Sequence, residues 1–171
     1  EGMNDACDTI DWIHAQPWSD GNVGMFGVSA QGITATFGGA ACPKVQAQII
    51  VKAPASVYHH ATYHGGVFRQ LDGETWLGAI DQDHTYQKYR NMPRYGPGWH
   101  HYDSLRRIPP VQSPALLIGA WYDVFQQGVL DAFVARESRE DSPTPGKNFL
   151  IMLNGSHRTT LSKDYRPRVK G

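Results

Sequence analysis

The stretch VGMFGVSAQG, residues 23–32, places a serine between two glycines directly after a short apolar run. The run favours a buried strand and the helix-permissive residues 33–41 follow it, so the stretch predicts a strand, a tight turn and a helix. A serine at such a turn is lifted off the sheet edge and can act as a nucleophile. Gly27 and Gly32 allow neighbouring backbone to pass close to the turn. Ser29 is therefore a candidate nucleophile; its alternative role is to cap the helix.

The bulk composition excludes several classes of partner. A chain of 171 residues is about one domain long, and a domain near that size can bury roughly 70% of its unfolded surface. Sixteen basic and sixteen acidic side chains cancel, so no overall field attracts nucleic acid or an anionic membrane. The apolar runs are far shorter than the ~20 residues that span a bilayer. We expect a soluble chain without nucleic-acid or membrane partners, while its compartment stays open.

Cysteine and histidine usage gives no sign of a metal site. Cys7, in a predicted helix, and Cys42, just after another, do not make a disulfide framework or a metal site. Histidines gather at 59–64 and 100–101, but no cysteines or carboxylates accompany them at ligand spacing. We expect no metal and no cofactor, with most of these histidines on loops or at the surface.

Helical and extended patterns alternate along the chain. Apolar residues spaced by three and four predict a helix from Met3 to about Gln16. Further strands are predicted at 45–53, 115–122 and 148–153, with a helix at 126–138 between the last two. Continuous apolar strands that alternate with helices imply an α/β fold, with a parallel sheet covered on both faces.

Residues 55–110 are rich in aromatic residues, histidine, glycine and proline. Linkers are poor in aromatic residues, so we predict an insertion with short helices that caps the site. Most aromatic side chains in it are expected to pack rather than to contact a substrate. The candidates for lining a substrate pocket are Tyr58, Phe68, Trp121 and Tyr122.

Two more polar residues follow predicted strands. Asp123 comes directly after the strand at 115–122, and His157 follows the strand at 148–153. Parallel sheets carry functional groups at the carboxyl ends of their strands, and the chain order serine, acid, histidine is that of α/β-hydrolases. In such a triad Ser29 attacks an acyl carbon, His157 takes its proton and Asp123 orients the imidazole. The alternatives are a helix cap for Asp123 and an ordinary loop histidine for His157.

Several segments together resemble the X-prolyl dipeptidyl-peptidase and cocaine esterase-like serine hydrolases, the CocE/NonD family of the α/β-hydrolase superfamily. Three segments resemble the approach to that family's nucleophile, one resembles its acid strand and one its histidine strand. They are DTIDW at 8–12, QPWS at 16–19, GNVGM at 21–25, PALLIGAWYD at 114–123, and residues 149–157.

The resemblance implies that the chain hydrolyses a small-molecule ester or amide through an acyl-enzyme, with the triad named above. The backbone N–H of Ala30 would be one oxyanion donor. The family usually has tyrosine at this position, glycine where Ala120 stands, and glycine-proline-tryptophan at 153–155. Acids that recognise an α-amino group in some members are missing from 124–127. This absence disfavours amino-acid esters and dipeptides as substrates.

The resemblance also implies that the four strands form the C-terminal half of an eight-stranded sheet. The strand ending at Ser29 would then be an exposed edge, through which an oligomer could form. We expect strands before Glu1, including a loop with a tyrosine oxyanion donor, and the isolated segment to be weak or inactive, because losing one such donor costs about 10²- to 10³-fold. The alternatives are an X-Pro dipeptidyl-peptidase and a non-catalytic relative that binds a ligand through its aromatic cap.

Overall fold

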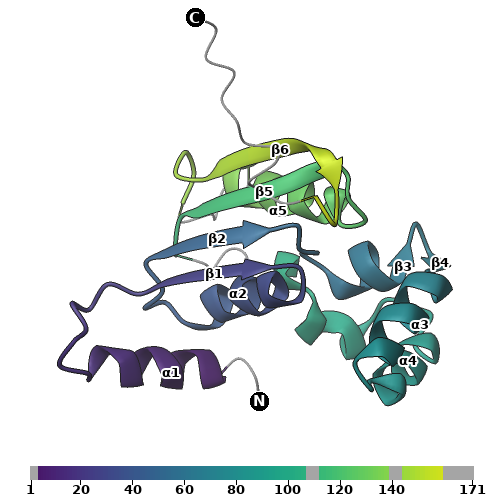
Figure 1. Cartoon of the computed structure of the whole chain (residues 1–171), viewed down its shortest axis with the longest axis horizontal. Helices are drawn as coiled ribbons and strands as arrows, with labels where there is room; N and C mark the ends of the chain where they lie inside the picture. Colours follow the sequence, from purple (N-terminus) through teal and green to yellow (C-terminus); the bar gives the residue numbers. More distant parts are fainter. Residues whose placement is uncertain (1–3, 107–111, 139–143, 160–171) are drawn as a thin grey trace, which may run out of the picture.

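A computed structural model describes residues 4–106, 112–138 and 144–159. Its centre is a four-stranded, fully parallel sheet with strand order β1-β2-β5-β6 (Figure 1). This confirms the predicted α/β class and all four predicted strands of the sheet. Met3 and residues 107–110 of the predicted cap lie outside the described residues. The strands are β1 (Gly24–Val28), β2 (Ala47–Val51), β5 (Ala115–Tyr122) and β6 (Phe149–Ser156).

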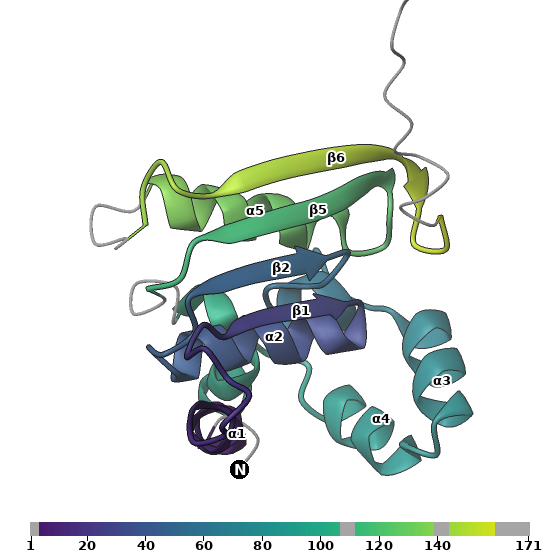
Figure 2. The same cartoon turned by 60° about the vertical axis from the view of Figure 1, so that its left-hand side comes forward.

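The three helices next to the sheet all lie on the same side of it (Figures 1 and 2). They are α1 (Asn4–His14), α2 (Ala30–Ala41) and α5 (Gln126–Ser138). The chain steps from β1 to β2 to β5 to β6 in a single direction across the sheet. Because crossovers between parallel strands are right-handed, steps in one direction place every connecting helix on the same face. No helix of the described part is long and apolar enough to cross a membrane.

The expectation that helices cover both faces of the sheet is therefore wrong for the described residues. The opposite face carries large apolar side chains that remain exposed, namely Phe26 (64%), Ile49 (40%) and Phe149 (67%). β1 pairs only with β2 in the described sheet, so the strand that ends at Ser29 is an edge, as predicted.

The segment between β2 and β5 forms a separate lobe beyond the carboxyl ends of the strands (Figure 1). A backbone bridge between Ser56 and Asp103 ties the two ends of this lobe together, and the N–H of Ser104 donates to the carbonyl of Ala55 at 2.9 Å. The short hairpin in the lobe has no counterpart among the predicted elements. The lobe contains η1 (Val57–Thr62), β3 (Tyr63–His64), β4 (Val67–Phe68), α3 (Gln70–Ala79), α4 (Asp83–Arg90), η2 (Pro97–Tyr102) and η3 (Ser104–Arg106).

An aromatic cluster forms the core of the lobe. The rings of Tyr58 and Tyr63 stack with their centroids 5.0 Å apart, and Trp99, almost fully buried, meets Tyr58 edge-on at 5.1 Å. The Tyr58 hydroxyl donates to the carbonyl of Pro93 at 2.8 Å. Most of the aromatic residues of this segment therefore pack against one another, as expected.

Cys7 and Cys42 form a disulfide, with their Cα atoms 5.2 Å apart. The expectation that these cysteines make no disulfide framework is thus corrected. The cause is the packing of α1 beneath the end of α2, where Ile10, Val23 and Cys42 share one buried cluster. A sequence separation of 35 residues gives no indication of this contact.

Removing the disulfide should lower stability measurably. A cross-link that closes a loop of this length removes about 3–4 kcal/mol of chain entropy from the unfolded state. We expect the double variant Cys7→Ser/Cys42→Ser to lose this amount of unfolding free energy in urea titrations. Dithiothreitol should lower the urea midpoint of the wild type to that of the double variant. It should leave the midpoint of the double variant unchanged. An identical midpoint for oxidised and reduced wild type would contradict the disulfide.

Candidate active site

Ser29 lies in a strained backbone turn between β1 and α2. Its φ is 55° and its ψ is −118°, a left-handed conformation that a non-glycine residue adopts only at a cost. A Cβ at Gly27 would lie 2.2 Å from the carbonyl oxygen of Gln31, and one at Gly32 would lie 2.6 Å from the Cβ of Ala53. Both glycines are therefore required by close approach, as the sequence predicts.

The Ser29 hydroxyl faces a histidine rather than the helix. Its Oγ lies 2.8 Å from Nε2 of His157. Ser29 occupies the N-cap position of α2, but its side chain makes no capping hydrogen bond. The alternative role of a helix-capping serine is thereby excluded for the side chain, although the backbone still begins the helix.

Asp123 lies on the other side of the His157 ring. Its Oδ2 is 2.9 Å from Nδ1 of His157, and its side chain is completely buried. Its Oδ1 accepts a hydrogen bond from the N–H of Phe125 at 2.6 Å. Because an ionised carboxylate only accepts, this contact places the imidazole proton on Nδ1 and leaves Nε2 free to accept from Ser29. Asp123 therefore closes the turn before α5 and contacts His157 at the same time.

His157 is carried by a tight turn that follows β6. The N–H of Thr159 donates to the carbonyl of Ser156 at 3.2 Å, and the N–H of Ser156 donates to Oγ1 of Thr159 at 2.9 Å. The ring of Phe125 meets the imidazole edge-on, with centroids 5.2 Å apart. Phe125 was not a sequence candidate, and its position two residues after the acid is the one signal that could have indicated it.

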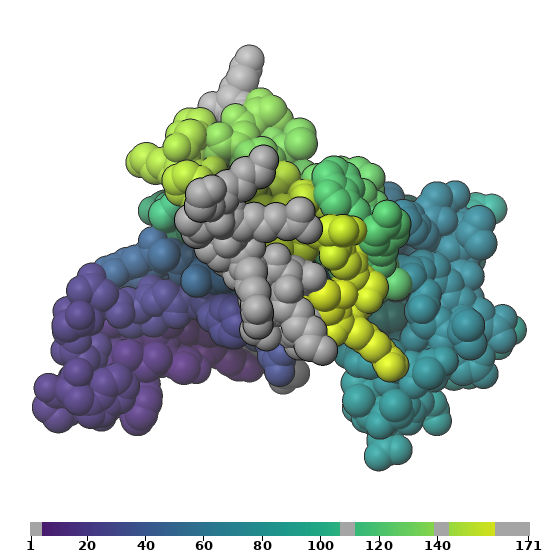
Figure 3. All heavy atoms as spheres, turned by 45° about the horizontal axis from the view of Figure 1, so that its top comes forward, coloured from purple at the N-terminus to yellow at the C-terminus, as the bar shows by residue number. Residues whose placement is uncertain are grey.

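A cavity of about 990 Å³ opens beside Ser29 and His157, between the sheet edge and the lobe. In Figure 3 the end of the chain's described part, in yellow, lies beside the teal lobe. Most of the side chains that line the cavity are apolar and belong to α3, α4 and the segment before them. The lining includes Phe68, Arg69, Asp72, Tyr86, Tyr89 and Phe125.

The cavity wall contains a few polar groups. In the part of the chain that the structure describes, the buried Tyr86 hydroxyl has no hydrogen-bond partner. Burial, reinforced by Tyr102, raises the pKa of Tyr89 to about 12. Arg69 pairs with Asp72 and donates to the carbonyl of Val124. Tyr86 lies in the polar sequence DHTYQKYR, where it is one of two large aromatic residues, and this is the signal that sequence reasoning left unused.

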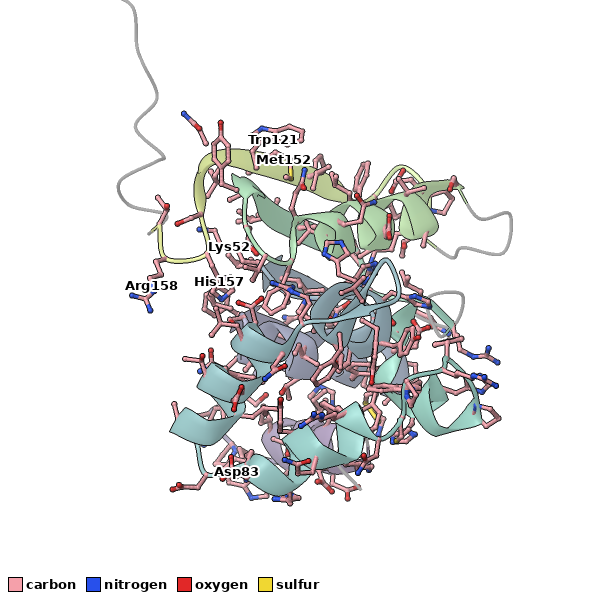
Figure 4. The ribbon with its side chains drawn as sticks, turned by 90° about the vertical axis from the view of Figure 1, so that its right-hand side faces the viewer. Lys52, Asp83, Trp121, Met152, His157 and Arg158 are labelled. Atoms are coloured by element: carbon pink, nitrogen blue, oxygen red, sulfur yellow. A yellow bond between two sulfur atoms is a disulfide. The ribbon has the colours of Figure 1, made fainter. Side chains whose placement is uncertain are left out.

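Of the four residues predicted to line a substrate pocket, one lines the cavity and three do not. Phe68 lines the cavity, whereas Tyr58 lies buried in the aromatic cluster of the lobe. Trp121 and Tyr122 are exposed by 53% and 74% at the end of β5 and do not line the cavity. Figure 4 shows Trp121 well apart from His157. The pairing of β5 with β6 is irregular between Ala120 and Tyr122, and there the final residues of β5 project into solvent.

The histidines of the lobe do not assemble a metal site. Within the described ranges, no three histidine, cysteine or acidic side chains gather as metal ligands. His60 departs from the expected surface position because it is only 4% exposed. Its Nε2 lies 2.8 Å from Oδ2 of Asp131, and its Nδ1 accepts from the N–H of Ser56. Burial lowers the pKa of His60, and Asp131 offsets this shift only in part.

Comparison with known families identifies the family to which the chain belongs. It matches the family described as X-Pro dipeptidyl-peptidase (S15 family) over residues 1–88 and 72–159. The chain belongs to this family. Thirty residues are 67% identical to a cocaine esterase of Rhodococcus sp. (strain MB1 Bresler), covering 18% of this chain and 5% of the esterase. The family resemblance seen in the sequence is thereby confirmed.

Solved structures share the fold of this S15 family chain. A CocE/NonD family hydrolase from Staphylococcus aureus has a TM-score of 0.72 and 18% identity, over 91% of this chain and 29% of its own. An α-amino acid ester hydrolase has a TM-score of 0.71 and 19% identity, over 92% of this chain and 32% of its own. The chain thus spans about a third of these structures, and at this identity the likeness shows an α/β-hydrolase fold.

Proposed function

We propose that the chain carries the catalytic core of a serine hydrolase that cleaves a carboxylic ester or amide through an acyl-enzyme. The observation that carries this proposal is the continuous contact from Ser29 through His157 to Asp123 at 2.8 and 2.9 Å. The contact opens onto an apolar cavity, which is typical of small-molecule sites. It also favours catalysis over a non-catalytic relative, in which His157 need not lie beside Ser29.

In the proposed reaction His157 accepts the Ser29 proton as Oγ attacks the carbonyl carbon. The new imidazolium is stabilised by the buried carboxylate of Asp123 and then protonates the leaving group. Water attacks the acyl-serine in the second half, with His157 again as the base. The N–H of Ala30, in the first turn of α2, has no partner within its helix and stabilises the oxyanion.

The cavity favours an ester or amide with an apolar acyl or leaving group. Its wall contains one acidic side chain among the described residues, Asp72, and that acid already pairs with Arg69. A substrate with a free α-amino group would need an unpaired carboxylate to bind it.

An X-Pro dipeptidyl-peptidase is the second candidate, because that activity gives the family its name. The two candidates differ in what they cleave. Hydrolysis of an Ala-Pro chromogenic amide without hydrolysis of a phenyl ester would assign the peptidase. Hydrolysis of the phenyl ester alone would assign the esterase.

Fluorophosphonate labelling tests the nucleophile directly. In the full-length protein we expect one phosphonyl adduct, located by mass spectrometry on the peptide that contains Ser29. The matched variant Ser29→Ala should gain none. The proposal fails if Ser29 of the folded full-length protein remains unlabelled under conditions in which a control serine hydrolase is labelled completely.

A further inference from the structure

Lys52 is a buried lysine immediately after β2. It is only 2% exposed, whereas lysine is almost never fully buried unless its charge is satisfied. Its Nζ donates to the carbonyl oxygens of Ser156 at 2.7 Å and Thr159 at 2.6 Å. These two carbonyls belong to the first and last residues of the turn that carries His157. Figure 4 shows Lys52 and His157 at the same end of the molecule.

The bonds of the Lys52 ammonium add to those that the turn makes itself. The turn closes through the contacts between Ser156 and Thr159 described above. Hydrogen bonds from a charged donor are about twice as strong as those between neutral groups. With both ends of a short turn held by one buried group, the position of His157 between them has little freedom.

The backbone beside Lys52 reaches the other two strands of the candidate triad. The carbonyl of Val51 accepts a hydrogen bond from the N–H of Ser29 at 2.9 Å. The N–H of Lys52 donates to the carbonyl of Ile118 in β5 at 2.7 Å, on the strand that leads to Asp123. A single peptide unit, Val51–Lys52, is thus bonded to both strands, while its side chain holds the turn of His157.

The backbone of Lys52 is itself strained. Its φ of 49° lies in the left-handed region, which a non-glycine residue adopts only where surrounding contacts require it. Packing alone is no reason to select a lysine here, because an apolar side chain of the same length would avoid the cost of burying a charge. The feature that distinguishes lysine at this position is its ammonium.

We propose that Lys52 is a positioning residue whose buried ammonium holds the turn of His157, and so keeps the imidazole within hydrogen-bond distance of Ser29. The catalytic part of this inference rests on the proposed hydrolase function. The structural part does not, because the position of the imidazole can be measured without turnover. Lys52 itself lies behind the turn and is not among the residues that line the cavity.

The first test is Lys52→Met in the full-length protein, which shortens the side chain by one atom and removes the ammonium. Displacing a reacting group by about 1 Å costs about 10²-fold, so we expect kcat for an ester to fall by roughly that factor while KM changes less than twofold. The rate of fluorophosphonate labelling should fall in parallel. Lys44→Met is the matched control, since Lys44 is half-exposed and pairs with Asp11 away from the site; its rates should equal those of the wild type.

The second readout is the imidazole itself. In the wild type we expect a downfield NMR resonance for the Nδ1 proton that His157 shares with Asp123. In Lys52→Met this resonance should broaden or disappear, while the methyl resonances of the buried core keep their dispersion. Retention of the resonance and of the labelling rate in the variant overturns the proposal. If the wild type shows the resonance but no labelling, the proposed function fails, and the NMR comparison still decides the role of Lys52.

A rescue experiment covers the case in which Lys52→Met does not fold. Lys52→Gly suits the left-handed backbone and leaves space for the missing side chain. We expect n-butylammonium to restore the labelling rate and the His157 resonance in a saturable way, and n-butanol to restore neither. A folded glycine variant that n-butylammonium does not rescue overturns the proposal.

Discussion

Asp123→Asn should lower kcat for ester hydrolysis by about 10⁴-fold, the loss found when the acid of a serine triad becomes an amide. The hydrogen bonds around Asp123 determine the orientation of the asparagine amide in the variant. Because the N–H of Phe125 donates to Oδ1 at 2.6 Å, the amide oxygen must occupy that position. The NH₂ group then faces Nδ1 of His157, which moves the imidazole proton to Nε2 and leaves no acceptor for the Ser29 hydroxyl.

The measurement is the initial rate of p-nitrophenyl ester hydrolysis by the full-length protein at saturating substrate. KM should change little, because Asp123 does not line the cavity. Asp131→Asn is the matched control, since Asp131 also pairs with a histidine, His60, but outside the cavity. Its kcat should stay close to that of the wild type, because Asp131 contacts His60 and Gln127 rather than Ser29 or His157. An Asp123→Asn variant that keeps a tenth of the wild-type rate would contradict the orienting role.

Gly27→Ala should both destabilise the fold and disable the candidate nucleophile. The added Cβ would lie 2.2 Å from the carbonyl oxygen of Gln31 and 2.6 Å from the nitrogen of Gly32. Both are backbone atoms in the first turn of α2, so no side chain can move to make room. Overpacking costs about 1–3 kcal/mol and more where backbone must shift. A displaced turn should also slow labelling of Ser29 by at least about 10²-fold.

Urea unfolding and the fluorophosphonate labelling rate measure the two effects separately. Gly78→Ala, in helix α3, is the control. Its added Cβ would lie 3.6 Å from Oδ1 of Asp83, which is an ordinary van der Waals contact. Alanine in a helix is favoured over glycine by about 1 kcal/mol, so this variant should be as stable as wild type or more so. Wild-type stability and labelling in Gly27→Ala would show that the turn is not as close as described.

Much of the candidate site could be predicted from local sequence pattern. The strand, turn and helix around Ser29 follow from an apolar run that breaks at glycine. The positions of Asp123 and His157 follow from their places after two other apolar runs. Parallel strands bring their carboxyl ends to one edge, so three residues far apart in the chain could be assigned to one place without knowing any contact.

Contacts that depend on packing could not be predicted in this way. The sequence does not indicate that Cys7 reaches Cys42, that Trp121 projects into solvent while Phe68 lines the cavity, or that the helices share one face of the sheet. Lys52 is the clearest case, because it falls within the predicted strand at 45–53 and no local pattern distinguishes it, yet its ammonium is buried against the turn of His157.

The sequence by itself therefore determined the type and order of the sheet strands and of the helices next to them, and the three polar residues at the strand ends. Both are encoded in side-chain periodicity over a few neighbouring residues. Only the tertiary structure decided which side of each element is covered and which distant groups satisfy one another. Those outcomes depend on the direction in which the chain crosses the sheet and on the need of every buried polar group for a partner, and neither is a property of any short stretch.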